Sequence, residues 1–264
     1  MSNKKFLSFS DVSFTYPPIK DDVDSNGVQL EQKPVFEHFS AELPGEFISL
    51  IGPNASGKST FMLLASGRIL PQTGSVSLFE KNTATLSEQA RGEMASFIFQ
   101  NMEFEQDDSV ELLLHQVFEN GLHTKEANGL SQENLLNEVI SVFELKSVLN
   151  HKLTGISKGE IQRVLLAFSV LYGSKSIFMD EPMFAMEERQ KESSLEYLVS
   201  YSKQKNIPIY VAMHEIDLVK KYSPKAILFY PNRDLSFGTP KEVLNDAALE
   251  KSYGVPVSYL KNYK

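Results

Sequence analysis

Residues 52–59 read Gly52-Pro53-Asn54-Ala55-Ser56-Gly57-Lys58-Ser59 and fit the pattern G-x-x-x-x-G-K-[ST]. The apolar run before them, residues 46–51, predicts a buried strand, and residues 60–66 after them predict a helix. Glycines at both ends let the backbone fold back with its N–H groups pointing at phosphate oxygens. The following helix offers its positive N-terminal end to the same anion. The stretch therefore predicts a loop that holds the phosphates of a nucleoside triphosphate.

Two side chains of this loop have separate expected roles. Lys58 is expected to reach the β- and γ-phosphates, and the hydroxyl of Ser59 is expected to ligate Mg²⁺. A glycine-rich turn without a ligand is the alternative, and the flanking strand and helix argue against it. The residues predicted to contact the nucleotide here are Gly52, Pro53, Asn54, Ala55, Ser56, Gly57, Lys58, Ser59 and Thr60.

Composition limits the classes of function. A chain of 264 residues suits one large domain, or one domain with a subdomain. The net charge of −8 argues against a broad nucleic-acid surface, so we expect no nucleic-acid partner. The absence of cysteine excludes disulfides, thiolate metal sites and a cysteine nucleophile. No apolar run approaches the roughly 20 residues that span a bilayer, and no signal peptide is evident, so we expect any membrane role to come through a partner protein.

Strand and helix patterns alternate along most of the chain. The strands are predicted at 6–16, 34–44, 46–51, 75–79, 95–100, 176–180, 207–213 and 226–230. Residues 101–155 instead show helical periodicity with polar breaks. The predicted fold is α/β: a P-loop NTPase core with a mostly parallel sheet, an N-terminal antiparallel β-subdomain and an inserted all-helical subdomain. We expect the core to comprise residues 1–100 and 156–264, and the helical subdomain to comprise 101–155.

An acidic, turn-rich segment follows the first strand. Within it, Asp22, Asp24, Asn26 and Gly27 have the spacing of the opening of a calcium loop. The bidentate glutamate expected at the twelfth position is replaced by Lys33. We therefore favour a solvated acidic turn, with a calcium site as the alternative.

A second motif, Asp180-Glu181-Pro182, ends the apolar strand 176–180. The carboxyl ends of parallel strands are where ligands bind in an open sheet. Asp180 is expected to hold Mg²⁺ through water, and Glu181 to orient the attacking water or accept its proton. The alternative is a strand that ends in a solvated acidic turn.

In their order and spacing these motifs resemble those of the ATP-binding subunits of ABC transporters, over almost the whole chain. The resemblance implies that Tyr16 stacks on adenine, with an ordinary strand-end tyrosine as the alternative. It implies that Gln100 is a metal ligand and links the γ-phosphate and Mg²⁺ to the helical subdomain, rather than being a surface glutamine. It also implies that His214 is the switch histidine that touches the γ-phosphate, although a lone histidine at a strand end is more often structural.

Residues 156–160, Ile-Ser-Lys-Gly-Glu, stand where this family has the signature Leu-Ser-Gly-Gly-Gln. By the resemblance, Ser157 offers its hydroxyl and Gly159 its backbone N–H to the γ-phosphate held by the other subunit. Lys158 replaces a glycine, so it either adds positive charge toward the phosphate or obstructs its approach. Residues 183–187, which the resemblance places at the dimer interface, also depart from the usual Thr-Ser-Ala-Leu-Asp.

The resemblance implies catalytic roles for Lys58, Gln100, Glu181 and His214, with ATP and Mg²⁺ as the cofactors. It implies that two copies, or this chain and a paralogous ATPase, close head to tail around two ATP molecules and push on a transmembrane permease. The chain would then be cytoplasmic and peripheral on the inner face of the cell membrane.

Residues 237–255 look like ATPases of importers for iron–siderophore, haem or cobalamin, although the same turn and capping helix occur in many relatives. Two alternatives stay open. One is a soluble ABC-type ATPase in an assembly or repair task such as iron–sulfur cluster building. The other is an ATP-binding regulatory module with weak hydrolysis.

Overall fold

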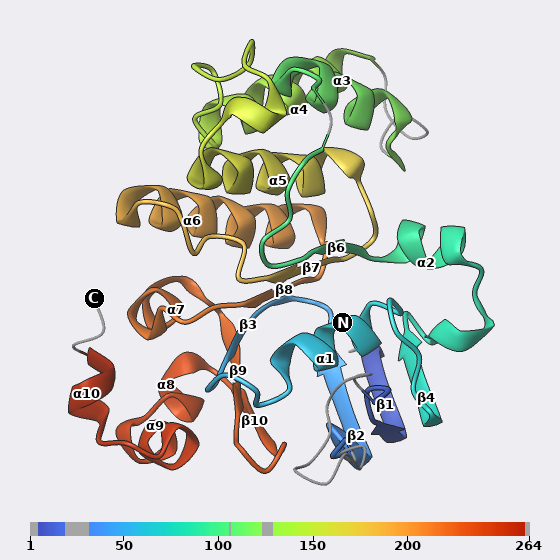
Figure 1. The fold of residues 1–264 in the computed structure, drawn as a ribbon, viewed down its shortest axis with the longest axis vertical. Helices are drawn as coiled ribbons and strands as arrows, with labels where there is room; N and C mark the ends of the chain where they lie inside the picture. The colour runs from blue at the N-terminus through green and yellow to red at the C-terminus, as the bar shows by residue number, and fades with distance from the viewer. Residues whose placement is uncertain (1–4, 19–31, 106, 123–128, 262–264) are drawn as a thin grey trace, which may run out of the picture.

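The structure, a computed structural model, describes residues 5–18, 32–105, 107–122 and 129–261. The acidic segment with Asp22, Asp24, Asn26 and Gly27 lies outside the described residues. The described strands form two sheets (Figure 1). This is the predicted α/β arrangement.

The N-terminal sheet is antiparallel, in the order β2-β1-β4-β5. One face of β1 is apolar because Leu7, Phe9 and Val12 are buried. The Phe9 ring stacks on Phe61 of the first helix at 4.7 Å between ring centroids, which fixes this sheet against the helix after the phosphate loop. The bounds are β1 (Lys5–Phe14), β2 (Phe36–Pro44), β4 (Thr73–Leu78) and β5 (Lys81–Asn82).

The central sheet has the order β10-β9-β3-β8-β7-β6, and all its neighbours are parallel except β10 and β9. Every residue of β3, β7 and β8 is buried, as expected for parallel strands that are covered on both faces. The bounds are β3 (Phe47–Ile51), β6 (Ser96–Ile98), β7 (Ile177–Asp180), β8 (Ile209–Ala212), β9 (Lys225–Phe229) and β10 (Leu235–Gly238).

Helices cover both faces of the central sheet. On one side, α5 and α6 lie against it and α3 and α4 lie beyond them; α1 and the antiparallel sheet cover the other side (Figure 1). Consecutive residues of β7 pack on opposite faces of the central sheet. Met179 belongs to the apolar cluster under α5 and α6, and Phe178 belongs to the cluster around α1. The α-helices are α1 (Lys58–Ala65), α2 (Glu88–Met94), α3 (Val110–Asn120), α4 (Gly129–Val142), α5 (Lys158–Tyr172), α6 (Glu188–Lys205), α7 (Ile216–Tyr222), α8 (Pro240–Val243), α9 (Asp246–Tyr253) and α10 (Val257–Lys261).

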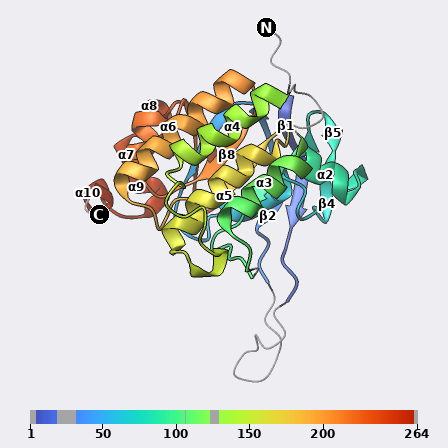
Figure 2. The same ribbon diagram turned by 90° about the horizontal axis from the view of Figure 1, so that it is seen from above.

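Helices α3 to α6 run side by side above the sheet (Figure 2). Arg163 of α5 donates to the carbonyl oxygens of Phe143 and Glu144, just after α4, at 3.0 and 2.6 Å. Apolar residues of α3 and α4 share one cluster with α5, α6 and the sheet. That residues 101–155 form a separate inserted subdomain stays a proposal. No helix in the described part of the chain has the length and apolar character that a bilayer crossing requires.

Candidate nucleotide-binding site

The loop between β3 and α1 has the backbone that an anion site needs. Gly57, the N-cap of α1, has φ 99° and provides no side-chain cap, so first-turn N–H groups remain for another acceptor. Gly52 has φ 155°, and a Cβ there would stand 2.9 Å from both the Cβ and the carbonyl oxygen of Phe229. Only glycine fits at Gly52. The Ser56 hydroxyl is also buried with no hydrogen-bond partner among the described residues.

The side chain of Lys58 folds back across this loop. Its ammonium donates to the carbonyl oxygens of Gly52 at 2.7 Å and Pro53 at 3.0 Å. Burial lowers the pKa of Lys58, and the nearby carboxylates of Glu181 and Asp180 act in the opposite direction. The loop thus holds a desolvated cation beside free N–H donors, an arrangement that suits phosphate.

Ser59 and Asp180 meet across the sheet edge, although 121 positions separate them in the sequence. Burial raises the pKa of Asp180, and the nearby Ser59 hydroxyl acts in the opposite direction. A hydroxyl and a carboxylate are oxygen ligands of the kind that Mg²⁺ takes beside substrate phosphates. The described residues contain no group of three or more His, Asp or Glu placed to hold a metal. By the chemistry of its two oxygen donors, the Ser59–Asp180 pair fits a magnesium ion that takes its other ligands from the nucleotide and water.

Glu181 is the centre of a three-residue hydrogen-bonded group. Its Oε1 lies 2.6 Å from His214 Nε2, and its Oε2 accepts from Gln100 Nε2 at 2.7 Å. The bond with His214 lowers the pKa of Glu181, and partial burial opposes that shift. The backbone of Glu181 is left-handed, with φ 49°, an uncommon conformation outside glycine that is found at functional sites. The sequence named all three residues, and the structure brings them together.

Tyr16 lies just past the end of β1, beside α1. Its hydroxyl is 3.1 Å from the Thr60 hydroxyl, and its ring meets Phe14 edge to face at 4.9 Å. With 39% of the residue exposed, the ring presents a surface next to the phosphate loop. That position suits stacking on a base.

Ser157 and Gly159 lie at the start of α5. In the described part of the chain no hydrogen bond or ion pair joins them to residues 52–59. Ser157 caps α5, and Glu160 Oε2 accepts from both the backbone N–H and the hydroxyl of Ser157 at 2.7 Å. A Cβ at Gly159 would stand 2.7 Å from the carbonyl oxygen of Ala185, so only glycine fits there without a backbone shift.

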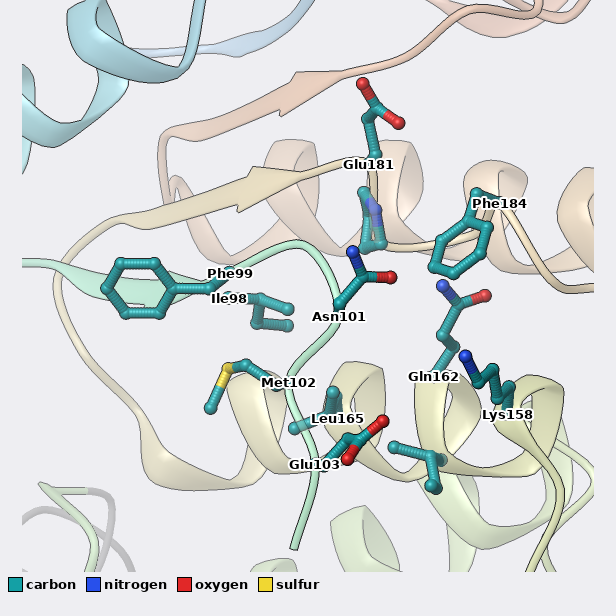
Figure 3. Close-up of a pocket in the computed structure, with 12 residues that line it drawn as sticks. Ile98, Phe99, Asn101, Met102, Glu103, Lys158, Gln162, Leu165, Glu181 and Phe184 are labelled. Atoms are coloured by element: carbon teal, nitrogen blue, oxygen red, sulfur yellow. The ribbon is translucent and has the colours of Figure 1, made fainter. Parts of the chain in front are cut away.

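Lys158 lies beside the region of Glu181 rather than among the loop residues. Its side chain lines a small hollow with Gln162 of α5, Phe184 and Glu181 (Figure 3). The amide oxygen of Gln162 also accepts from the N–H of Ala185 at 2.8 Å, which ties α5 to the segment after β7. The two segments that depart from the resembled family therefore pack on each other.

Replacing Glu160 by Ala is expected to lower the free energy of unfolding by about 0.5–2 kcal/mol at neutral pH, because the capping box is lost. The bonds to Ser157 lower the pKa of Glu160, so its stabilisation is complete above the ordinary glutamate pKa and is lost as pH falls through the lowered value. Urea unfolding measures the free energy of unfolding of wild type and of Glu160→Ala. The difference between the two proteins should be smaller at acid pH than at neutral pH. The control, Glu160→Gln, keeps an acceptor without the charge and should lose less. An equal difference in free energy of unfolding at both pH values would contradict the capping role of the Glu160 carboxylate.

Two residues that support the site, Glu215 and Arg233, were not predicted from the sequence. Glu215 Oε2 accepts from the backbone N–H of His214 at 3.3 Å, and its Oε1 pairs with Lys191 of α6. The Arg233 guanidinium donates to the carbonyl oxygen of Ala55 in the phosphate loop. The position of Glu215 next to His214 was an available signal. Nothing in the local sequence of Arg233 indicates its contact.

Comparison with known proteins gives a consistent result. Residues 38–184 match the family described as ABC transporter. A hemin import ATP-binding protein of Escherichia coli O157:H7 is 25% identical over 242 residues, which cover 88% of this chain and 91% of that protein.

Two solved structures share the fold. One is the ATP-binding subunit of an ABC transporter, with a TM-score of 0.73, 21% identity and coverage of 97% of this chain and 98% of that one. The other is a dimeric ATP-binding cassette bound to ADP and Pi, with a TM-score of 0.72, 20% identity and coverage of 89% of this chain and 98% of that one. These likenesses confirm the predicted fold class.

Proposed function

The chain belongs to the ABC transporter family and is an ATPase of that family, and we propose that it drives the import of a solute through a separate membrane permease. One observation carries the proposal. The loop 52–57, the Ser59–Asp180 pair and the Gln100–Glu181–His214 group all follow the ends of the adjacent strands β3, β6, β7 and β8.

In the proposed mechanism the chain's own residues position the phosphates and a water. Lys58 and the loop N–H groups balance the charge of the transferred phosphoryl group, which is the main requirement of this chemistry. Ser59 and Asp180 would hold Mg²⁺, which supplies further charge neutralisation at the β- and γ-phosphates. In this structure Gln100 donates a hydrogen bond to Glu181. We propose that Gln100 leaves this partner and approaches the metal when nucleotide is bound.

Glu181 is the proposed contact for the attacking water. Glu181 is ionised at neutral pH, and its lowered pKa makes it a weak base. We therefore propose that it acts first by orienting the water and accepts its proton as the phosphoryl group is transferred. Both of its oxygens are occupied by Gln100 and His214 in this structure. Each oxygen can accept a further hydrogen bond, so a water can be held beside these partners. If the bond with His214 opens, that histidine is free to reach the γ-phosphate.

The proposed assembly is a dimer, homodimeric or with a paralogous ATPase, in which Ser157 and Gly159 of one copy face the phosphates bound by the other. The dimeric cassette that shares the fold supports a dimeric assembly. The dimer is proposed to dock on a transmembrane permease at the inner face of the membrane. Haem is the proposed cargo, and iron–siderophore complexes and cobalamin are the alternatives. The similarity to a hemin import ATP-binding protein supports haem.

Reconstitution tests this function. The chain should be purified with a candidate hemin permease and placed in proteoliposomes that contain Mg-ATP. We expect the permease to raise the rate of phosphate release, and hemin, rather than cobalamin or a ferric siderophore, to accumulate in an ATP-dependent manner. Hydrolysis that no permease changes would contradict the transport role, and uptake of a different solute would replace haem as the cargo.

A second function, a regulatory module that holds ATP with weak hydrolysis, is favoured by one observation. Lys158 stands in place of a small signature residue and packs near Phe184, itself an unusual residue for its segment. Measuring phosphate release by the chain with and without the permease separates the two functions, because a regulatory module would stay slow in both.

A further inference from the structure

We propose that the C-terminal part of the chain holds the phosphate loop in its binding shape through two positioning residues, Arg233 and Tyr253. The inference rests on the proposed nucleotide site and extends it. Both residues lie well outside the range 38–184 that matches the family. In the proposed mechanism neither residue contacts the nucleotide.

Arg233 reaches the loop from the turn between β9 and β10. Its guanidinium donates to the carbonyl oxygen of Ala55, whose backbone is left-handed with φ 58°. Such a conformation costs free energy for alanine and persists only where surrounding contacts support it. The hydrogen bond from Arg233 is such a contact at the tip of the loop.

The turn that carries Arg233 is itself tightly built. The N–H of Tyr230 donates to the carbonyl oxygen of Asp234 at 2.9 Å, and the N–H of Arg233 donates to the carbonyl oxygen of Tyr230 at 3.0 Å. Asn232 Nδ2 donates to Asp234 Oδ2 at 2.6 Å. A side chain that starts from this turn therefore begins at a fixed position relative to the central sheet.

Tyr253 reaches the other end of the loop from the last residue of α9. It lies close to the backbone of Gly52, which lowers the pKa of Tyr253, whereas burial has the larger effect and raises it to about 12. The carbonyl oxygen of the same Gly52 accepts from Lys58. The neighbouring Ser252 donates to the carbonyl oxygen of Phe229 at 2.7 Å, which fastens α9 to the sheet beside the loop.

The two contacts therefore fall at the first residue of the loop and near its tip. A phosphate loop binds well only when its N–H groups already converge, because nucleotide must otherwise supply the free energy that orders them. Losing an anchor lowers the population of the competent shape and raises the apparent dissociation constant by the same factor. Neither anchor touches the reacting atoms, so kcat is expected to change much less than KM.

Titration of the full-length chain with a fluorescent ATP analogue and Mg²⁺ tests the proposal, together with steady-state kinetics. Tyr253→Phe removes one hydroxyl and should raise Kd and KM about fivefold, since the polar contact with the backbone of Gly52 is lost. The matched control is Tyr259→Phe on exposed α10, the same chemical change away from the loop, which should bind like wild type.

Three substitutions of Arg233 separate hydrogen bonding from charge. Arg233→Ala should raise Kd about fivefold or more, and Arg233→Gln, which keeps a donor without charge, should recover much of that loss; Arg233→Lys should recover it as well. Recovery with Lys alone would show that charge acts directly on the nucleotide and would overturn the positioning role.

Wild-type binding by both Tyr253→Phe and Arg233→Ala would also overturn the proposal. Thermal unfolding of each variant shows whether it is folded, and Tyr253→Phe and Arg233→Gln keep the test available if Arg233→Ala does not fold. A wild-type chain that binds no nucleotide would refute the proposed function instead, so the two failures are distinguishable.

Discussion

Replacing Glu181 by Gln is expected to slow ATP hydrolysis by about 10²–10⁴-fold, the usual contribution of a positioned proton acceptor. The substitution preserves the shape of the side chain but removes the carboxylate that meets His214 and Gln100. ATP binding should survive, because the residues proposed to hold the phosphates are unchanged. We therefore expect an ATP-bound dimer to accumulate, visible by light scattering at saturating Mg-ATP alongside a phosphate-release assay.

The matched control for Glu181→Gln is Glu192→Gln on α6. Glu192 is also a carboxylate with a lowered pKa, but its partners are Lys221 and Tyr222 on α7, away from the proposed site. The control should hydrolyse ATP at the wild-type rate. A Glu181→Gln protein that stays monomeric with saturating ATP, or that keeps the wild-type rate, would contradict the scheme.

Replacing Lys58 by Ala is expected to abolish measurable hydrolysis, with a loss of at least about 10²-fold. Lys58 supplies a buried cation within the loop, and a preorganised charge in a desolvated site is worth several kcal/mol to a developing anion. Steady-state phosphate release measures the effect, and a calorimetric titration with Mg-ATP shows how much of it is binding.

Lys5→Ala is the control for the loss of a lysine. Lys5 of β1 pairs with Glu42 of β2, and both side chains are exposed, so this ion pair contributes little. This variant should keep both binding and hydrolysis. An unchanged rate in Lys58→Ala, in a protein that is folded by its thermal transition, would remove Lys58 from its assigned role.

The sequence predicted much of the fold because its decisive signals are local. The apolar strand, glycine loop and helix over 46–66 form one continuous pattern, and the structure reproduces it as β3, the loop and α1. The apolar strand before Asp180 likewise placed the acids at the sheet edge. The meeting of Glu181 and His214 follows from parallel topology, because β7 and β8 are adjacent and end at the same edge.

What the sequence did not reveal depends on long-range contacts or weak patterns. Strand β10 has no buried residue and pairs antiparallel at the sheet edge, so its four residues lack a strong apolar signal. Residue Gln100 lies past β6, which ends at Ile98, rather than in the strand predicted to reach it. The contact of Arg233 with Ala55 joins residues 178 positions apart, and no local pattern encodes such a pair.

The structure explains part of the difference between residues 156–160 and the signature Leu-Ser-Gly-Gly-Gln of the family. Glu160 makes a reciprocal capping box with Ser157, so at this position a carboxylate stabilises the start of α5. Gly159, which matches the resembled signature, faces the Ala185 carbonyl too closely for any side chain. The structure gives no comparable reason for Lys158.

The most direct test of the account is a crystal structure of Glu181→Gln grown with saturating Mg-ATP. We predict β- and γ-phosphates within hydrogen-bond distance of the N–H groups of residues 54–59, Lys58 turned from the loop carbonyls to the phosphates, and adenine against Tyr16. Nucleotide bound elsewhere, with the loop 52–59 empty and Lys58 still on Gly52 and Pro53, would contradict the central claim.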